Sequence, residues 1–404
     1  MILICSILLY ARLTLQAAQV DALTVSPEVA IARGKLAEAQ ALYDQARATY
    51  GPALIGNYAQ SPQAGQTGSG TVEQRLTTVG ASWTLGDLFA YAPAVAEAGA
   101  ALQSARMSLS DAERNQEVEV ITAYFTALGA HAVQNARTEE LAAANIELHA
   151  ATLRFSAGDA PRLDVVRAMV AVASAQADVA RAQADADTAA DTLAVDTGVS
   201  AASFQTIVPS EREIPPLKID ANDAITLALA RRPDIASARE NVAAEEHAVA
   251  VARRGSWPLL TLTGGYTTGV DTGIHVAGTS ASVDLSLPVT GAAHERVLAE
   301  EARLAQALAE LQKVERGVRL EVGAAIRDYR AESAALSASE RALEGASAEV
   351  AATQIGYRSG AIASIDVEAA RTAYVQALVN EISALYAQAK ARATLNLTVG
   401  ETNE

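Results

Sequence analysis

The sequence has one cysteine, Cys5, five scattered histidines and few aromatic residues, which make up 4% of the chain. A single cysteine cannot form a disulfide framework, and the histidines include no H-x-x-x-H pair of the kind that binds zinc. We therefore expect no catalytic centre, no metal and no cofactor. The net charge of −16 argues against nucleic acid, which needs a basic face. Beyond the N-terminus no run of about 18 apolar residues occurs, so no transmembrane helix is expected.

What the chain has in abundance is alanine, within a hydrophobic fraction of 50% over 404 residues. Alanine loses no side-chain entropy in a helix, so this composition favours long helices. Alanine also buries little area, and such helices must pack closely as bundles or coiled coils. We expect a mainly α protein with a small β part.

The N-terminal segment, residues 1–22, is interpreted as a signal peptide. Its apolar stretch from Ile2 to Tyr10 is too short to span a bilayer and matches the core of such a peptide. The usual positive charges before that stretch are missing, so either the start is misplaced or the interpretation is wrong. Cys5 could indicate lipidation, but Ile4 precedes it where a small residue is usual.

The chain is an internal duplication with a period of about 206 residues. The segment SPEVAIARGKLAEAQALYDQARATYGPALIGNY, from Ser26, aligns without gaps with RPDIASARENVAAEEHAVAVARRGSWPLLTLTGGY, from Arg232. Further on, RFSAGDAPRLDV matches GYRSGAIASIDV, which places Gly158 on Gly360. The duplication predicts a first repeat over 23–198, a connector over 199–232 and a second repeat over 233–404.

Each repeat has the same predicted order of elements. A helix of about 25 residues comes first, then two strands, then a long helix (about Ala92–Phe155 and Ala293–Tyr357), a tight turn and a return helix. At 1.5 Å per residue the long helices would reach roughly 95 Å. The prolines are expected outside these helices, with Pro93 at a boundary between strand and helix.

The predicted strands alternate apolar and small polar residues, as in Leu260, Leu262 and Tyr266 against their threonine neighbours. Four strands cannot close a barrel alone, whereas three copies would supply twelve. Aromatic residues in or near the strands would suit a membrane-interface belt: Trp83, Tyr91, Trp257 and Tyr266. The alternative is a soluble sandwich with these aromatics in its core.

The duplicated segment from Arg232 and the repeated tip pattern F/Y-x-x-G-x-x-x-x-x-D-V resemble the TolC-like outer-membrane efflux protein family over nearly the whole chain. The resemblance implies a homotrimer with a twelve-stranded β-barrel among the lipids of a Gram-negative outer membrane. It also implies a long periplasmic α-helical barrel that meets an adaptor protein and an inner-membrane pump. Such a duct carries drugs, metal ions or secreted polypeptides.

The resemblance also implies a gate at the helical tips, where a tyrosine and an arginine of the second repeat bind an aspartate of the first. Tyr357 and Asp164 match that pattern, but Ile362 stands at the arginine position, with Arg358 nearby. Acidic residues are expected around the constriction, and Asp366 and Glu368 are the candidates; both could instead begin a helix. The expected tip and adaptor-contact residues are Gly158, Asp164, Tyr357, Arg358, Gly360, Asp366 and Glu368.

Two other interpretations were weighed. Asp196-Thr197-Gly198 and Asp271-Thr272-Gly273 spell the D-T-G of aspartic proteases, but neither stands in a catalytic context, and Gly198 suits a helix end. A coiled-coil interaction protein of the cell envelope, without a pore, would explain the helices but not the paired amphipathic strands.

Overall fold

The computed structural model describes residues 14–49, 51–64, 71–85, 87–199, 220–255, 257–271, 274–287, 291–359 and 361–400. The chain divides into two compact units. Unit 1 comprises Met1–Ile31, Ser110–Arg232 and Arg316–Glu404, and unit 2 comprises Ala32–Leu109 and Pro233–Glu315. Because the chain is duplicated, each unit takes matching pieces from both repeats.

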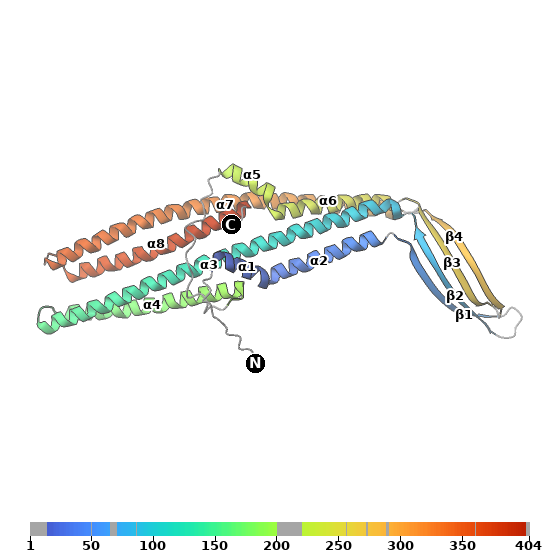
Figure 1. The fold of residues 1–404 in the computed structure, drawn as a ribbon. Helices are drawn as coiled ribbons and strands as arrows, with labels where there is room; N and C mark the ends of the chain where they lie inside the picture. Colours follow the sequence, from blue (N-terminus) through green and yellow to red (C-terminus); the bar gives the residue numbers. More distant parts are fainter. Residues whose placement is uncertain are drawn as a thin grey trace, which may run out of the picture. The chain divides into compact units, whose positions relative to one another are not determined.

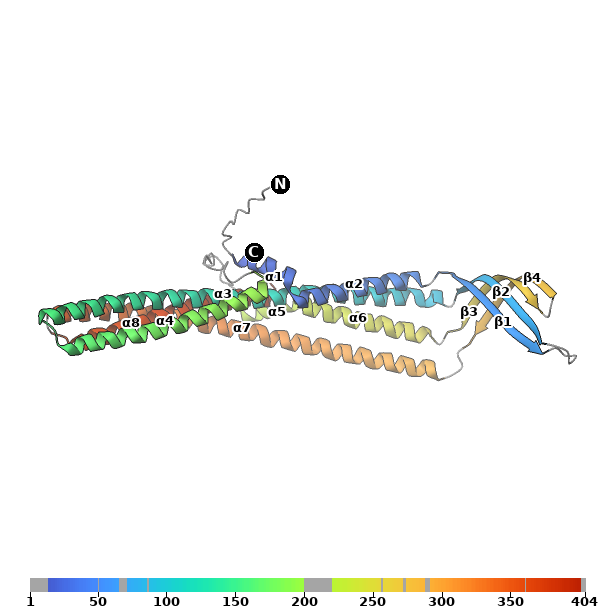
Figure 2. The ribbon, with the colours of Figure 1, turned by 90° about the horizontal axis from the view of Figure 1, so that it is seen from below.

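Unit 2 contains one antiparallel sheet in the order β1-β2-β3-β4 (Figure 2). The strands are β1 (Ala53–Ala64), β2 (Thr71–Thr84), β3 (Leu259–Asp271) and β4 (Ile274–Ser286). Each repeat supplies one hairpin, and β2 pairs with β3 to join the two repeats. The prediction of two strands per repeat is confirmed.

The strand register sorts the side chains into an apolar and a polar face. Leu262 lies opposite Trp83 on one side and Val283 on the other, whereas Thr263 lies opposite Ser82 and Ser282. Residues that are directly opposite share a face, so the predicted alternation holds across the sheet. Its apolar face is uncovered in the single chain: Leu54 is 89% exposed, Val79 62% and Val283 68%.

Two shorter helices complete unit 2 together with the first parts of α3 and α7. These are α2 (Pro27–Ala48) and α6 (Pro233–Arg254), which begin at matching prolines as predicted. Small residues let the helices approach closely. The hydroxyl of Ser237 on α6 lies 3.1 Å from that of Ser104 and 2.9 Å from that of Ser108, both on α3.

Unit 1 contains two helical hairpins, visible in Figures 1 and 2. One joins α3 (Asp87–Ala157, 71 residues) to α4 (Arg162–Thr197), and the other joins α7 (Ala292–Arg358, 67 residues) to α8 (Ser364–Val399). The short helices α1 (Leu15–Val25) and α5 (Ala221–Arg231) precede α2 and α6. The core gathers residues of α1, α3, α4 and α8: Leu15, Ala18, Ala22, Val120, Ile121, Ala123, Tyr124, Phe125, Ala127, Leu128, Ala189, Leu193, Ala393 and Leu397.

The structure differs from the sequence-based boundaries at the N-terminus. Residues 15–22, which fall within the expected signal peptide, belong to helix α1, and Ala18 and Ala22 are fully buried in the core. The apolar residues 1–13 lie outside the described residues. A shift of about 206 residues places α1 on α5, so the two short helices occupy matching positions in the duplication.

The expectation that every proline lies outside the long helices is wrong for Pro93. Helix α3 begins at Asp87, so Pro93 is inside it. A proline in that place removes one backbone donor but leaves the rest of a very long helix intact. The placement of the other long-helix boundaries agrees with the sequence to within a few residues.

The junctions that precede α2 and α6 show how the repeats have diverged. Ser26 and Arg232 occupy matching positions, and both are buried, at 4% and 3% exposure. The Ser26 hydroxyl donates to Gln116 Oε1 at 2.6 Å. Arg232 instead forms an ion pair with Glu321 Oε2 at 2.9 Å. The buried polar side chain at the first junction is thus satisfied by a neutral hydrogen bond, and the one at the second junction by an ion pair.

Two further features concern the helices of the described part. None of them is both long and apolar enough to cross a membrane. Gly198 ends α4 with φ +68° and its N–H donates to Ala194 O, so this D-T-G sequence is a helix cap. In the second D-T-G sequence Asp271 ends β3, and residues 272–273 lie outside the described residues.

Three carboxylates from different helices influence one another in unit 2. Burial raises the pKa of Glu97 on α3 above its usual value, and the carboxylates of Glu245 and Glu300 add to the rise. His247 opposes it. Both Glu97 and Glu245 are half-buried and line a cavity of about 680 Å³, so their charged forms are only partly solvated.

We expect Glu97→Gln to raise the melting temperature of the protein at neutral pH. Because the folded-state pKa is raised, the contribution of Glu97 to stability is fully present below the unfolded value of 4.5 and is lost as pH rises through the folded-state pKa. Glutamine does not ionise and so avoids this loss of stability, which solvent screening keeps below about 1 kcal/mol. Circular dichroism melts at pH 4 to 7.5 should show the gain shrinking toward pH 4.

The matched control is Glu310→Gln, which removes the same charge from α7 where Lys313 lies 2.8 Å away. That variant should gain nothing at neutral pH. A Glu97→Gln protein no more stable than the parent at pH 7 would contradict the interpretation.

Candidate functional site

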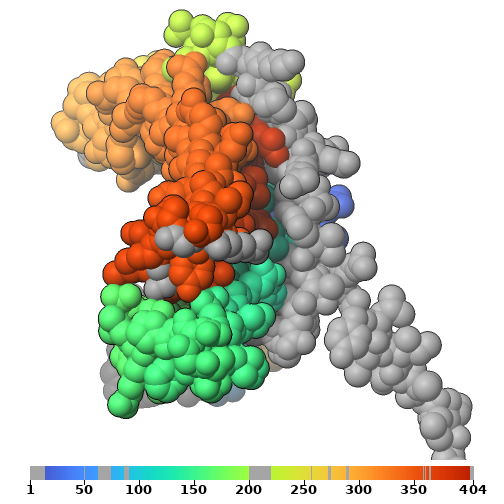
Figure 3. Space-filling view, turned by 90° about the vertical axis from the view of Figure 1, so that its left-hand side faces the viewer, coloured from blue at the N-terminus to red at the C-terminus, as the bar shows by residue number. Residues whose placement is uncertain are grey.

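The first hairpin of unit 1 reverses at Gly158, as the sequence predicted. The φ angle of Gly158 is +85°, which is unfavourable for a residue with a Cβ, and the Gly158 N–H donates to Phe155 O at 3.0 Å. In the second hairpin Ala361 N–H donates to Gly356 O at 2.9 Å. Gly360, the expected counterpart of Gly158, lies outside the described residues. The two tips lie side by side, green and orange-red in Figure 3.

Ile362, which stands at the family's arginine position, packs into the second turn. A Cβ on Gly356 would lie 2.4 Å from the Cδ1 atom of Ile362, so this glycine makes room for the isoleucine. The Ile362 side chain packs within its own turn and has no charged group that could bind the first hairpin. The expected arginine bond is therefore not made from this position, and the side chain of Arg358 lies outside the described residues.

The hydroxyl of Tyr357 pairs with Arg154 and not with Asp164, contrary to expectation. Arg154 Nη1 on α3 donates to the Tyr357 hydroxyl on α7 at 2.6 Å. The guanidinium carbon also lies 5.8 Å from the centre of the tyrosine ring, within cation–π range. The second-repeat tyrosine does bind the first repeat, but its partner is a cation.

Glu147 extends this contact to a third helix. One of its carboxylate oxygens lies 2.8 Å from Arg154 Nη2, and the other accepts from Arg371 Nη1 on α8 at 3.4 Å. We call Glu147, Arg154, Tyr357 and Arg371 the tip network; it connects α3, α7 and α8. Sequence reasoning missed three of these four residues. The available signal was the seven-residue spacing of Glu147 and Arg154, which puts both on one face of α3.

The electrostatics of the tip network favour a fixed charge on Arg154. Burial alone lowers the pKa of Arg154, but the hydrogen bond to Glu147 and the contact with Tyr357 outweigh it and the net pKa is raised. Arg154 therefore stays charged at any physiological pH. The side chains of Glu147 and Arg154 are each 35% exposed, so salt screens their attraction in part.

A cavity of about 360 Å³ lies beside the tip network, and we call it the tip cavity. Three expected residues line it: Asp164, Tyr357 and Glu368. Asp164 sits in the first turn of α4, where Arg167 Nη1 approaches it to 3.8 Å. The apolar part of the lining includes Val166 and Val170. The structure thus gathers three of the seven tip residues around one space.

Asp366 serves the start of helix α8. Its Oδ2 accepts from Ala363 N–H at 3.3 Å, which satisfies one of the free donors at a helix N-terminus. This is the alternative role weighed from the sequence. Glu368, two residues later, is half-buried and lines the tip cavity.

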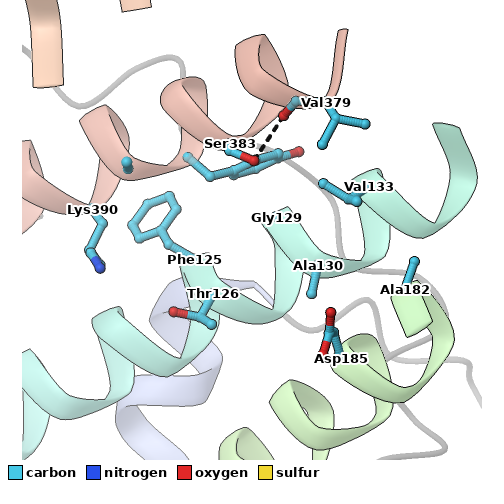
Figure 4. Close-up of a pocket in the computed structure, with 12 residues that line it drawn as sticks. Phe125, Thr126, Gly129, Ala130, Val133, Ala182, Asp185, Val379, Ser383 and Lys390 are labelled. Carbon is cyan, nitrogen blue, oxygen red and sulfur yellow. Dashed lines mark hydrogen bonds between the residues drawn. The ribbon is translucent and has the colours of Figure 1, made fainter. Parts of the chain in front are cut away.

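A second cavity, of about 380 Å³, lies between α3, α4 and α8, nearer the core (Figure 4). The close-up shows Phe125 and Val133 of α3 facing Val379 and Ser383 of α8. Ser383 donates to the backbone of Val379, and Asp185 lies at the edge on α4. The described residues contain no group of three or more His, Cys, Asp or Glu that could hold a metal ion.

The four expected interface aromatics belong to unit 2 and are exposed. Trp257 lies two residues before β3, and Trp83 lies next to the last residue of β2, so both mark one end of the sheet. Tyr91 lies in the first turns of α3. Tyr266 instead lies at the middle of β3, opposite Val79 and Thr279, and so does not belong to that end.

Comparisons with known proteins agree on one family. A family model described as outer membrane efflux protein matches residues 19–199 and 224–401. Nodulation protein T of Rhizobium leguminosarum bv. trifolii is 25% identical over 390 residues, which are 92% of this chain and 80% of the relative.

Solved structures of outer-membrane channels share the fold. CmeC of Campylobacter jejuni superposes with a TM-score of 0.79 at 17% identity, covering 96% of this chain and 85% of CmeC. VceC of Vibrio cholerae superposes with a TM-score of 0.79 at 19% identity, covering 96% of this chain and 97% of VceC. The open state of MtrE from Neisseria gonorrhoeae superposes with a TM-score of 0.77 at 20% identity, covering 96% of this chain and 89% of MtrE. The mainly α fold with a four-stranded sheet is thus the fold of these channels.

We expect Asp366→Ala to loosen the start of α8 by about 0.5–1 kcal/mol, because the Ala363 N–H loses its acceptor and the helix dipole loses a favourable charge. Hydrogen exchange of the amides in 363–368 should become faster. Asp366→Asn retains an acceptor oxygen and should show a smaller change. Equal exchange in all three proteins would contradict the capping role.

Proposed function

The chain belongs to the outer membrane efflux protein family, and from that premise we propose that three copies form one continuous exit duct. The protein is an outer-membrane efflux channel and not an enzyme. In the proposed assembly the three sheets close a twelve-stranded barrel in the outer membrane of a Gram-negative bacterium. The helical hairpins form a tunnel in the periplasm.

The observation that carries this proposal is the open sheet of unit 2. Its outer strands, β1 and β4, each have only one neighbouring strand in the described chain. In lipid, an unpaired backbone donor or acceptor costs several kcal/mol, so an open edge is not tolerated there. Pairing β4 of one chain with β1 of the next satisfies both edges, and closure after three chains gives a barrel of the size that bacterial channels use.

The distribution of exposure over the sheet supports the same assembly. On β2 and β3 the polar face, with Thr78 and Thr267 hydrogen-bonded at 2.9 Å, is half-buried, while the apolar face is exposed at Val79 and Tyr266. A soluble sandwich would cover the apolar face. An apolar face outside and a polar face inside are instead the arrangement of a membrane barrel around water.

The hairpin tips offer a contact surface for a periplasmic adaptor protein, through which the duct would meet an inner-membrane pump. Large apolar side chains stay exposed at the first tip, including Leu153, Leu163 and Met169. An exposed apolar cluster of this kind marks a contact surface. Drugs, metal ions and polypeptides all fit a passive duct whose pump selects the cargo.

The alternative of a coiled-coil protein without a pore is wrong, because the matched family and the solved relatives are channels. The paired amphipathic strands that this alternative left unexplained are the ones that form the sheet.

We expect detergent-solubilised protein to have the mass of three protomers in light scattering. The physical reason is that each open sheet edge needs a partner strand. Chains that remain monomeric yet fully folded would overturn the shared barrel.

We expect arginine to be rejected on the apolar face of the sheet and accepted on the polar face. Val79→Arg, near the middle of β2, should destabilise the protein by about 2–4 kcal/mol, with a smaller loss for Leu262→Arg beside Trp83. Urea unfolding from lipid vesicles measures these losses. Thr263→Arg is the control on the polar face and should leave assembly intact; equal tolerance of all three changes would refute the assignment.

A further inference from the structure

The apolar face of the sheet carries very little charge. It consists of the alternate positions of β1 to β4 that share a side with Val79. Among the described side chains of this face, Arg75 is the only one with a permanent charge, His275 is the only imidazole, and none is acidic. The remaining described side chains are apolar or small and polar, so these two residues stand out chemically.

The strand register brings the two residues into one row across the sheet. Arg75 of β2 lies opposite Val270 of β3, and Val270 lies opposite His275 of β4. On its other side Arg75 lies opposite Gln60 of β1. The side chains of Gln60, Arg75 and His275 are exposed, and each has N–H groups that can donate hydrogen bonds. We call these three residues the outer row.

The outer row lies near the end of the sheet that is away from the helices. Helices α2, α3, α6 and α7 join the sheet at its other end, which Trp83 and Trp257 mark (Figure 2). Arg75 comes eight residues before Trp83 on β2, which is about 27 Å along a strand. At a strand tilt of about 40° this corresponds to about 20 Å of height, close to the apolar band of about 25 Å on membrane barrels. A long arginine side chain at that height extends its charge to the membrane surface.

An exposed tyrosine next to the outer row supports this depth. Tyr58 of β1 lies opposite Thr77 on the same face and is 61% exposed. Its hydroxyl donates to Gln60 Oε1 at 3.2 Å. Because rings with a polar tip prefer the boundary between membrane and water, Tyr58 marks one boundary and Trp83 the other.

We propose that the outer row binds the phosphate groups of lipid in the leaflet that faces the outside of the cell, with one site on each protomer. The proposal rests on the proposed function, because only a closed barrel in the membrane puts this face against lipid. The guanidinium of Arg75 presents a fork of donors that matches a phosphate. His275 lies two strands away, about 10 Å across the sheet, and adds a donor for the same headgroup.

The test measures the temperature at which purified trimers dissociate in an uncharged detergent, with lipid A as the probe. Saturating lipid A should raise this temperature in the parent by about 5 °C or more, because a ligand that binds only the assembled protein stabilises it. The half-saturating lipid A concentration should rise about tenfold in Arg75→Gln and about threefold in His275→Gln. The double variant should show no shift.

Two more substitutions separate the fork and the charge of the site. Arg75→Lys should give an intermediate response, because lysine keeps the charge but loses the fork. Glu73→Gln removes an acid two residues from Arg75 along β2 and should lower the half-saturating concentration, because a negative charge repels phosphate.

The matched control is Arg106→Gln, which removes an exposed arginine of α3 that donates to Gln103. This variant should respond to lipid A like the parent. Without lipid A all the variants should dissociate at the temperature of the parent, which shows that they assemble normally. Inorganic phosphate, and lipid A from which the phosphates have been removed, should leave the parent unchanged.

The outcomes separate the lipid site from the function on which it rests. If the parent forms no trimer and no conducting channel, the proposed function falls and the lipid site falls with it. If the parent conducts but gains no stability from lipid A, or no more than the double variant gains, only the lipid site is overturned. A full shift with inorganic phosphate would show a site for a free anion, and a full shift with dephosphorylated lipid A would show binding through the acyl chains; either result overturns the proposal.

Discussion

The backbone of the two outer strands sets the strongest constraint on this protein. A sheet of four strands leaves one side of β1 and one side of β4 without a strand partner in the described chain. Where lipid replaces water, these groups must find partners on other chains. The exposed apolar face, together with the half-buried polar face of β2 and β3, fits the closed assembly that we propose. In that assembly oligomerisation is the condition for pairing both sheet edges.

A second constraint is the packing of the long, alanine-rich helices of unit 1. Alanine allows close approach but contributes little buried area, so the few large residues decide where packing is firm. Tyr124, Phe125 and Leu193 concentrate that area at one level of the hairpins. Gly129 lets Tyr386 of α8 approach α3, with its ring carbon 3.5 Å from a Cβ added to the glycine. Toward the tips the buried apolar side chains are small, as at Ala151, Ala168 and Ala370, and polar contacts add to their packing.

Much of the fold follows from local patterns in the sequence. The duplication, the prolines that begin α2 and α6, and the two-residue alternation of the strands each predict an element or a face that the structure contains. The local patterns did not predict helix α1, whose buried side chains find their partners on α3, α4 and α8. The prediction for Pro93 was wrong because a proline near the start of a very long helix can be tolerated.

The candidate site was less accessible from the sequence, because its partners are set by how the hairpins are rotated against each other. The tip pattern predicted the turn at Gly158 and, as one of two alternatives, the place of Asp366 at the start of a helix, which are local features. It could not predict that Tyr357 would pair with Arg154, since that contact joins residues 203 positions apart. Ile362 shows why the inherited pattern was misleading: once its side chain packs on Gly356, a charge for the other hairpin must come from elsewhere. Arg371 supplies that charge from the second hairpin, while Arg154 of the first hairpin binds Tyr357; the opposite repeat carries methionine and glycine at these two positions. The two tips share a matching backbone hydrogen bond, from Asp159 to Arg154 and from Ala361 to Gly356, and divergence at a few half-buried positions gave them different side-chain partners.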